Sequence, residues 1–183
     1  AVKLGKICND LRLLSSGPRT GLAEIHLPPM QPGSSIMPGK VNPVIPEAVN
    51  QTAYQVIAND LAVTLAAEAG QLQLNAMEPL IVYNLLNSMK MLCNASEMLE
   101  QRCVRGIEAN REQCAQHLDN SIGVITALVP HIGYANASRI AKTALNSGST
   151  VRELVIREGL LDSVQLDQLL SPQSMLAPGA QLA

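Results

Sequence analysis

The sequence predicts an all-α protein, with a segment of a long-helix bundle, a small helical C-terminal domain and one loop rich in glycine and proline. The composition is 47% hydrophobic and 15% charged without Phe or Trp, so Leu, Ile, Val, Ala and Met must form the core. Apolar residues recur at three- and four-residue steps over long stretches, as in amphipathic helices. Turn residues divide the rest into shorter helical segments.

The first half is expected to hold the long helices. Residues 4–14 have the apolar spacing of a helix, which "SSGPRTG" ends. A second helix is predicted over 46–69, with Pro46 in its first turn and Gly70 after its end. A third is predicted over 76–105, where Asn75 and Glu78 resemble a capping box. Apolar residues on several faces of both long helices point to a bundle completed by other chains.

The predicted helices are shorter after Gly106 than before it. We expect them at about 110–119, 121–128, 135–147, 150–158 and 163–170. This divides the chain into residues 1–108, which are the C-terminal part of a central helical-bundle domain, and a small helical domain over 109–183. A short alternation in "LAEIHL" predicts a brief strand in the first part.

Charge and composition exclude several classes of protein. A net charge of -2 and three tyrosines as the sole aromatic residues argue against nucleic-acid binding. No apolar run is long enough for a membrane span, and no signal peptide opens the chain. The four cysteines lack a C-x-x-C spacing and are expected to be reduced, buried thiols of a cytoplasmic protein. The chain starts without Met in helical spacing, which suggests a piece of a longer protein.

The stretch "QPGSSIMPGKVNPVIPE" is rich in glycine, which loses much backbone entropy on ordering, and in proline, which prevents regular hydrogen bonding. Because such a loop is unfavourable in a helical protein, we interpret it as a functional site. It is not a phosphate-binding P-loop, because five residues separate Gly33 from Gly39 and Val41 follows Lys40. A serine hydrolase is not indicated either, since the sequence has no G-x-S-x-G motif. The histidines at 26, 117 and 131 have no catalytic setting, and His26 is expected to be a surface residue.

Several segments resemble the fumarase/aspartase superfamily. "GSSIMPGKVNP" matches its signature loop, here residues 32–42, and "KICNDLRLLSSGPRTGLAEI", "PVIPEAVNQ" and "GIEANRE" extend the resemblance over the chain. "AGQLQLNAMEP" resembles the aspartate ammonia-lyase (aspartase) branch, while fumarases differ in that segment. His26 and "PPMQ" depart from the usual residues before the loop.

The resemblance implies the C-terminal portion of a homotetrameric enzyme that eliminates ammonia from L-aspartate to give fumarate. Its partner would be a small dicarboxylate or amino acid, with no cofactor, metal, nucleic acid or membrane. The chain alone is expected to be inactive. Two alternatives stay open, a fumarate hydratase and a non-catalytic helical module for oligomerisation.

The residue types of the loop suit the stabilisation of an anion. Gly33 and Gly39 let backbone N–H groups approach a charged group closely, and Lys40 brings a positive charge. Asn42 can orient a substrate through its amide, and the N-terminus of the next helix favours negative charge. Lys40 and Asn42 are therefore predicted to bind a substrate carboxylate.

Two catalytic assignments come from the resemblance. It makes Ser34 the base that removes a proton from carbon, with Ser35 a structural or amide contributor beside it. It makes Glu47 the residue that orients a histidine of the N-terminal half, which this chain does not include.

Overall fold

The structure is a computed structural model that describes residues 1–33, 37 and 40–176. It confirms the all-α class, since helices carry almost all of the regular structure in the described part of the chain. The chain divides into two compact units, Ala1–Asn110 and Arg111–Ala183. No described helix has both the length and the apolar character that a membrane crossing requires.

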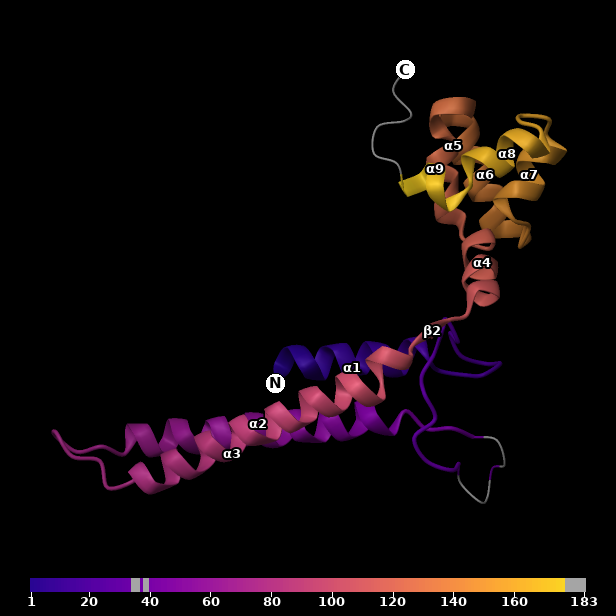
Figure 1. Ribbon diagram of the computed structural model, residues 1–183. Coiled ribbons are helices and arrows are strands. Elements are labelled where there is room, and N and C mark those ends of the chain that lie inside the picture. The colour runs from indigo at the N-terminus through magenta and orange to yellow at the C-terminus, as the bar shows by residue number, and fades with distance from the viewer. Residues whose placement is uncertain (34–36, 38–39, 177–183) are drawn as a thin grey trace. The chain divides into compact units, whose positions relative to one another are not determined.

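Three helices form the body of the first unit (Figure 1): α1 Val2–Leu14, α2 Val44–Glu68 and α3 Glu78–Arg102. α2 and α3 run antiparallel along their length, as two long helices with a short connection are expected to do, and α1 lies along one end of the pair. The predicted brief strand is confirmed as β1 Ile25–His26, which pairs antiparallel with β2 Glu108–Ala109. A 3-10 turn, η1 Val104–Gly106, leads from α3 to β2.

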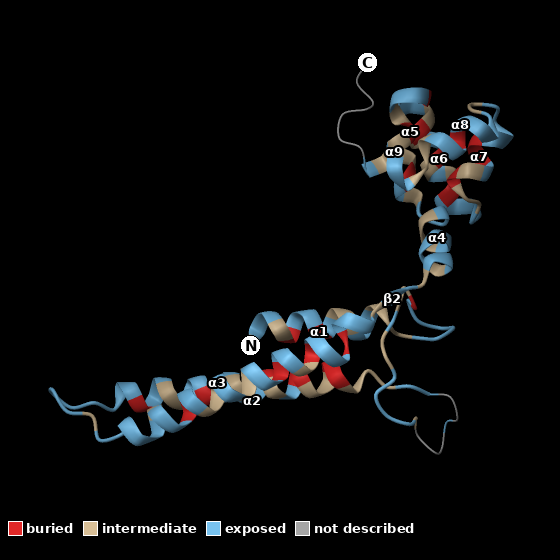
Figure 2. Ribbon diagram, in the orientation of Figure 1, coloured by how far each residue is buried: buried red, intermediate tan, exposed pale blue. Residues whose placement is uncertain are grey.

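The core of this unit lies where the three helices meet, and Figure 2 shows that burial fades along the rest of the α2–α3 pair. Its buried members are Cys8, Ile45, Val49, Ala95, Leu99 and Cys103. Because the core occupies one end of the pair, it fixes the N-terminus of α2, and hence the end of the loop that precedes it.

The predicted capping box at the start of α3 is wrong. The residue before α3 is Met77, and no side chain caps the helix, so Asn75 and Glu78 form no capping box. Asn75 instead joins the two long helices, since its Nδ2 donates to the Ala66 carbonyl at 2.9 Å and its Oδ1 accepts from the Met77 N–H at 2.8 Å.

The cysteines differ from the expectation as well. The four side chains are thiols and not disulfides, but Cys8 and Cys103 are buried while Cys93 and Cys114 are exposed. Helical spacing gave no means of separating the two kinds, because it shows the face of a residue and not what covers that face.

The second unit is a cluster of short helices. They are α4 Arg111–Asp119, the 3-10 turn η2 Ile122–Val124, α5 Ile125–Ile132, α6 Tyr134–Ser147, α7 Val151–Arg157, α8 Ser163–Leu169 and α9 Pro172–Leu176. Their buried apolar residues form one core, centred on Leu128, Ile140, Leu154 and Leu166, each with 0% exposure. The unit therefore has a core of its own.

Candidate active site

The two arms of the signature loop meet at Gly33 and Lys40. A Cβ atom placed on Gly33 would lie 1.8 Å from the Lys40 carbonyl oxygen, a distance that no side chain can accept. On the outgoing arm, the Lys40 N–H donates to the Met37 carbonyl at 3.1 Å, and the Val44 N–H donates to the Asn42 carbonyl at 2.9 Å. Glycine at 33 is thus what lets the two arms close at the base of the loop.

The side chains of three predicted site residues are available for a ligand. Lys40 is exposed, and Asn42 and Glu47 are partly buried. Within the described residues, none of the three side chains makes a hydrogen bond or an ion pair. Glu47 stands in the first turn of α2, where the helix dipole favours its negative charge.

The helix N-terminus contributes less than the sequence suggested. The Val44 N–H is bonded to Asn42 and the Glu47 N–H to the Pro43 carbonyl at 3.1 Å, while Pro46 has no N–H. The first turn of α2 therefore has few amides left for an anion, and Lys40 is the main positive group that the described loop residues offer.

Three predicted site residues, Ser34, Ser35 and Gly39, lie outside the described residues. The structure brings Gly33 and Lys40 together and places Asn42 and Glu47 on either side of the start of α2.

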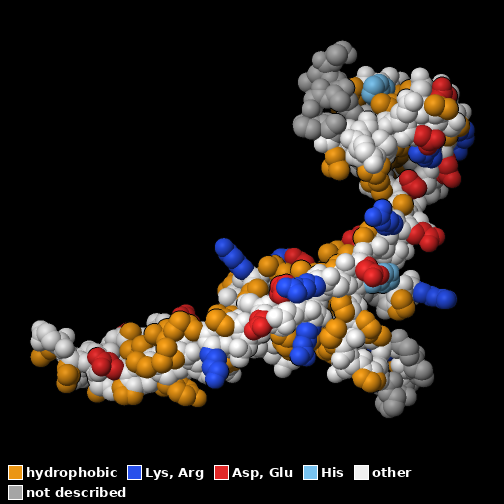
Figure 3. Space-filling view, viewed as in Figure 1, with side chains coloured by type: hydrophobic (Ala, Val, Ile, Leu, Met, Phe, Trp, Pro, Cys, Tyr) orange, Lys and Arg blue, Asp and Glu red, His pale blue; other side chains and the backbone are white. Residues whose placement is uncertain are grey.

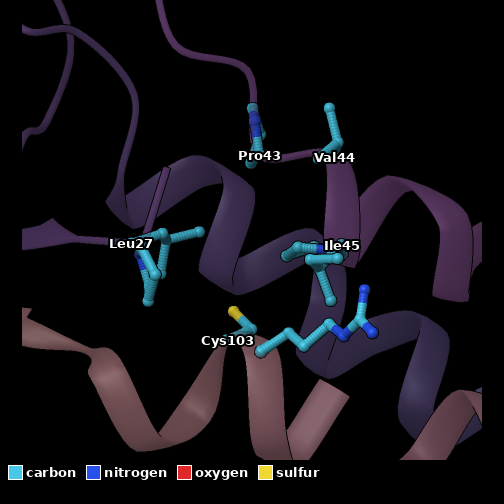
Figure 4. A pocket seen from close by; sticks show the side chains of 8 residues that line it. Leu27, Pro43, Val44, Ile45 and Cys103 are labelled. Carbon is cyan, nitrogen blue, oxygen red and sulfur yellow. The ribbon is translucent and has the colours of Figure 1, made fainter. Parts of the chain in front are cut away.

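A small pocket lies beneath the loop, between its two ends and the C-terminal end of α3 (Figure 4). In the close-up, Leu27, Ile45 and Cys103 converge on it from three segments of the chain. Its volume is about 10 Å³, which is at most the space of one water molecule. It is a gap in the packing that holds the loop ends, and it is too small for a substrate.

A larger hollow of about 640 Å³ lies at the connection between α2 and α3, lined by residues such as Leu72, Leu74 and Met77. The 25 residues of α2 separate it from the signature loop, roughly 37 Å at 1.5 Å per residue. It is open and mostly apolar, so we attribute it to surface shape and not to the chemistry of the loop.

Two further observations concern polar groups of the described residues outside the loop. His26 is exposed in β1, opposite Glu108, which confirms its expected surface position. Among the described residues, no three His, Cys, Asp or Glu side chains gather in a way that could hold a metal ion.

The fold and the loop agree with what comparisons of the sequence find. Residues 1–58 match the family model described as "Lyase", and residues 124–177 match the one described as "Fumarase C C-terminus". The chain therefore belongs to the fumarase/aspartase superfamily of lyases.

Relatives within this superfamily are similar over nearly all of the chain. An aspartate ammonia-lyase of Pseudomonas aeruginosa is 65% identical over 97% of the chain, and that of Escherichia coli is 54% identical over the same share. The chain spans 38% and 37% of these two relatives.

Solved structures of proteins from the same superfamily are also similar to the chain. A fumarate lyase:delta crystallin of Brucella melitensis, bound to cobalt, is 64% identical with a TM-score of 0.91, over 97% of this chain and 38% of that one. A class II fumarase of Schistosoma mansoni is 38% identical with a TM-score of 0.86, over 97% of this chain and 37% of that one.

Proposed function

We propose that the full-length protein carrying this chain is an aspartate ammonia-lyase, which converts L-aspartate reversibly to fumarate and ammonia. The observation that carries the proposal is the contrast in identity, 65% to an ammonia-lyase against 38% to a class II fumarase. The chain supplies the C-terminal portion, in keeping with its match to a model of the fumarase C C-terminus and its 38% share of the relatives.

The reaction breaks a C–H bond next to one carboxylate and the C–N bond on the neighbouring carbon. Removal of the proton leaves two negative charges on the carboxylate, so the site must stabilise an anion that water would otherwise solvate. Lys40 is the group for this task, because it is exposed at the base of the loop and makes no ion pair within the described residues. Asn42, which follows it, orients the same carboxylate.

Ser34 is assigned as the base that takes the proton. A serine alkoxide needs stabilisation by positive charge and N–H groups, and Lys40 with the amides around Gly33, Ser35 and Gly39 would supply both. Glu47 acts through a histidine of another part of the protein, which it orients by hydrogen bonding. Its lack of an ion pair among the described residues leaves its carboxylate free to accept that bond.

The test compares Ser34→Ala and Ser35→Ala in the full-length protein, with fumarate followed by its ultraviolet absorbance. Loss of a general base should lower kcat by about 10²–10⁴-fold with little change in KM, and Ser34→Ala should show this loss. Ser35→Ala should stay close to wild type. A dead Ser35→Ala beside an active Ser34→Ala would move the base by one residue. Malate as the better substrate of the wild type would make the protein a fumarate hydratase.

Assembly into a homotetramer is part of the proposal. Figure 3 shows apolar side chains gathered over the far part of the α2–α3 pair. The exposed apolar residues of these two helices include Tyr54, Ile57, Leu61 and Leu65 of α2 and Tyr83, Leu86 and Met89 of α3, each at least 45% exposed. So much exposed apolar surface on two adjacent helices is typical of an interface between chains.

Replacement of Leu61 by Glu would test the assembly, because a charge at the centre of an apolar interface must be desolvated. Leu145→Glu is the matched control, since Leu145 is 74% exposed but lies on α6, in the other unit. Light scattering of the full-length protein should give a tetramer for wild type and control and smaller species for Leu61→Glu. A monomeric wild type would contradict the proposal.

We also propose that the reaction takes place in the cytoplasm, because four cysteines that form no disulfide fit a reducing compartment. We also propose that the enzyme needs no redox cofactor, because elimination of ammonia involves no net oxidation or reduction.

A further inference from the structure

The segment after α3 reaches the incoming stem of the signature loop, which we define as residues 23–28. β2 pairs with β1 in the register Ile25 with Ala109 and His26 with Glu108. The next residue, Asn110, extends the contact, because its backbone N–H donates to the Glu24 carbonyl at 2.9 Å. The incoming stem is therefore fixed by residues about 85 positions later in the chain.

Asn110 also holds the stem through its side chain. Its Nδ2 donates to the Ala23 carbonyl at 2.9 Å, and the Ala23 N–H donates to the Ser16 carbonyl at 2.8 Å. Ala23 has a φ of 49°, a left-handed conformation that residues with a side chain rarely adopt. A strained residue persists only where its surroundings hold it, and here hydrogen bonds hold both of its backbone groups.

Gly106 contacts the stem at its other end. A Cβ atom on Gly106 would lie 2.4 Å from Cγ of Pro28, and 3.5 Å and 3.6 Å from that ring's Cβ and Cδ. The proline ring thus rests on the bare backbone of Gly106, immediately before the loop. A side chain at 106 would have to push the stem away.

The outgoing stem, residues 40–46, is anchored on the same end of α3. Ile45 is buried in the core with Leu99 and Cys103, and Val44 and Leu27 pack against that core. In Figure 4, Ile45 and Leu27 face Cys103 from opposite sides of the small pocket. Both stems thus share one support, and a shift of the incoming stem alone would change how Gly33 meets Lys40.

We propose that Gly106 and Asn110 are positioning residues that set the incoming stem against the outgoing stem, and so align Lys40 and Asn42 for the reaction, a role that rests on the function proposed above. In this role neither residue has to touch the substrate. The simpler alternative is that residues 106–110 only stabilise the fold, and the two roles give different results.

The first test is kinetic and uses the full-length protein. Gly106→Ala should lower kcat for aspartate by about 10-fold to 10²-fold, because small misplacements of reacting groups have effects of that order. KM should rise by a smaller factor, because Lys40 and Asn42 also contact the bound substrate, and the melting temperature should change little, since the core stays in place. Gly5→Ala is the control, because its Cβ would meet Ala53 and Asn50 at ordinary distances of 3.7 Å and 3.9 Å.

Asn110→Asp tests the second residue and covers the case in which Gly106→Ala fails to fold. It keeps the size of the side chain but loses the donor to the Ala23 carbonyl, so it should show the same fall in kcat. Two results would overturn the proposal: wild-type kcat in both variants, or a loss of activity that only follows a loss of melting temperature.

The second test needs no activity and uses the 183-residue chain. Deuterium exchange in Gly106→Ala and Asn110→Asp should rise about 10-fold or more in peptides covering residues 22–33 and stay unchanged in α2 and α3. Unchanged exchange at the stem, or a rise throughout the unit, would overturn the proposal. A wild-type protein without lyase activity would refute the proposed function, while exchange would still decide whether these residues hold the stem.

Discussion

The thiol of Cys8 shows how burial sets the chemistry of a single residue. Its side chain is 0% exposed in the core between α1, α2 and α3. Burial, with a smaller contribution from Cys103, raises the pKa of Cys8 from 9.0 to about 11, while Arg12 acts in the opposite direction. Burial also raises the pKa of Cys103. Both thiols stay protonated near neutral pH, and the thiolate is the reactive form.

We therefore expect a thiol-alkylating reagent at pH 8 to label exposed Cys114 in the native 183-residue chain and to leave Cys8 and Cys103 unmodified. The pKa of the Cys8 thiol is higher in the folded state than in the unfolded state. The contribution of the buried, protonated thiol to the free energy of unfolding is therefore complete below pH 9 and is lost as the pH rises toward 11. Peptide mass spectrometry after labelling, with and without denaturant, measures this directly. Rapid native labelling of Cys8 would contradict the burial.

The sequence points to some of the proposed site residues and not to others. Gly33, Lys40 and Asn42 could be predicted because an uninterrupted run of residues carries their chemistry. Asn110 could not be, since its proposed role depends on a hydrogen bond to Ala23, 87 positions earlier. The segment "GIEANRE" is part of the family resemblance, but the sequence does not show what the segment does. The structure shows that it contains β2, which pairs with β1.

At the scale of elements, buried polar residues mark the seam between α2 and α3. Asn59 is 8% exposed, and its Nδ2 donates to Oγ of Ser88 at 3.0 Å, while its Oδ1 accepts from Gln55 at 2.9 Å. Such a pair fixes how two helices align, because a shift along the axis would leave a polar group unpaired in an apolar seam.

Ser88→Ala should lower the free energy of unfolding by about 1–3 kcal/mol, because it leaves the Asn59 amide without its acceptor. The control is Thr64→Ala, since the exposed Thr64 hydroxyl donates only to the Asp60 carbonyl of its own helix at 3.0 Å. Denaturant unfolding of the 183-residue chain compares the two. Equal, small effects would show that the seam does not depend on this contact.

The predicted helix boundaries agree with the observed ones where residues such as proline or glycine mark the start or end of a helix. The helix predicted over 46–69 is observed at Val44–Glu68, and that over 135–147 at Tyr134–Ser147, which ends at Gly148 with φ 70°. Two capping boxes, Thr150 with Glu153 and Asp162 with Gln165, begin α7 and α8 and follow the residue spacing that predicts a helix start. The Asn75 prediction was wrong because the same side chain bonds across to α2, which spacing along one helix cannot show.

At the scale of the whole molecule, the buried core among the described residues of the second unit comes from residues 124–166, and Leu118, Leu169 and Leu170 of the same unit pack against it. A segment that buries its own apolar residues can fold without the rest of the chain. We expect residues 111–176, expressed alone, to be helical by circular dichroism and to unfold in one cooperative transition. A non-cooperative melt would show that this unit needs contacts outside itself.

The last prediction is that the 183-residue chain does not convert aspartate by itself, although it holds the signature loop. L-aspartate carries two carboxylates and an ammonium group, and the binding residues that we assign in the chain, Lys40 and Asn42, can hold only one carboxylate. The chain spans 38% of the length of an aspartate ammonia-lyase, and we propose that the histidine partner of Glu47 and the second carboxylate site lie in the rest.

Mixing the chain with the complementary part of the protein should restore fumarate production, and Ser34→Ala in the chain should abolish it again. Fumarate absorbance measures both, with the complementary part alone as the blank. Turnover by the isolated 183 residues would show that the loop and its supports already form a complete site, and the assignment of Glu47 to an outside histidine would then be wrong.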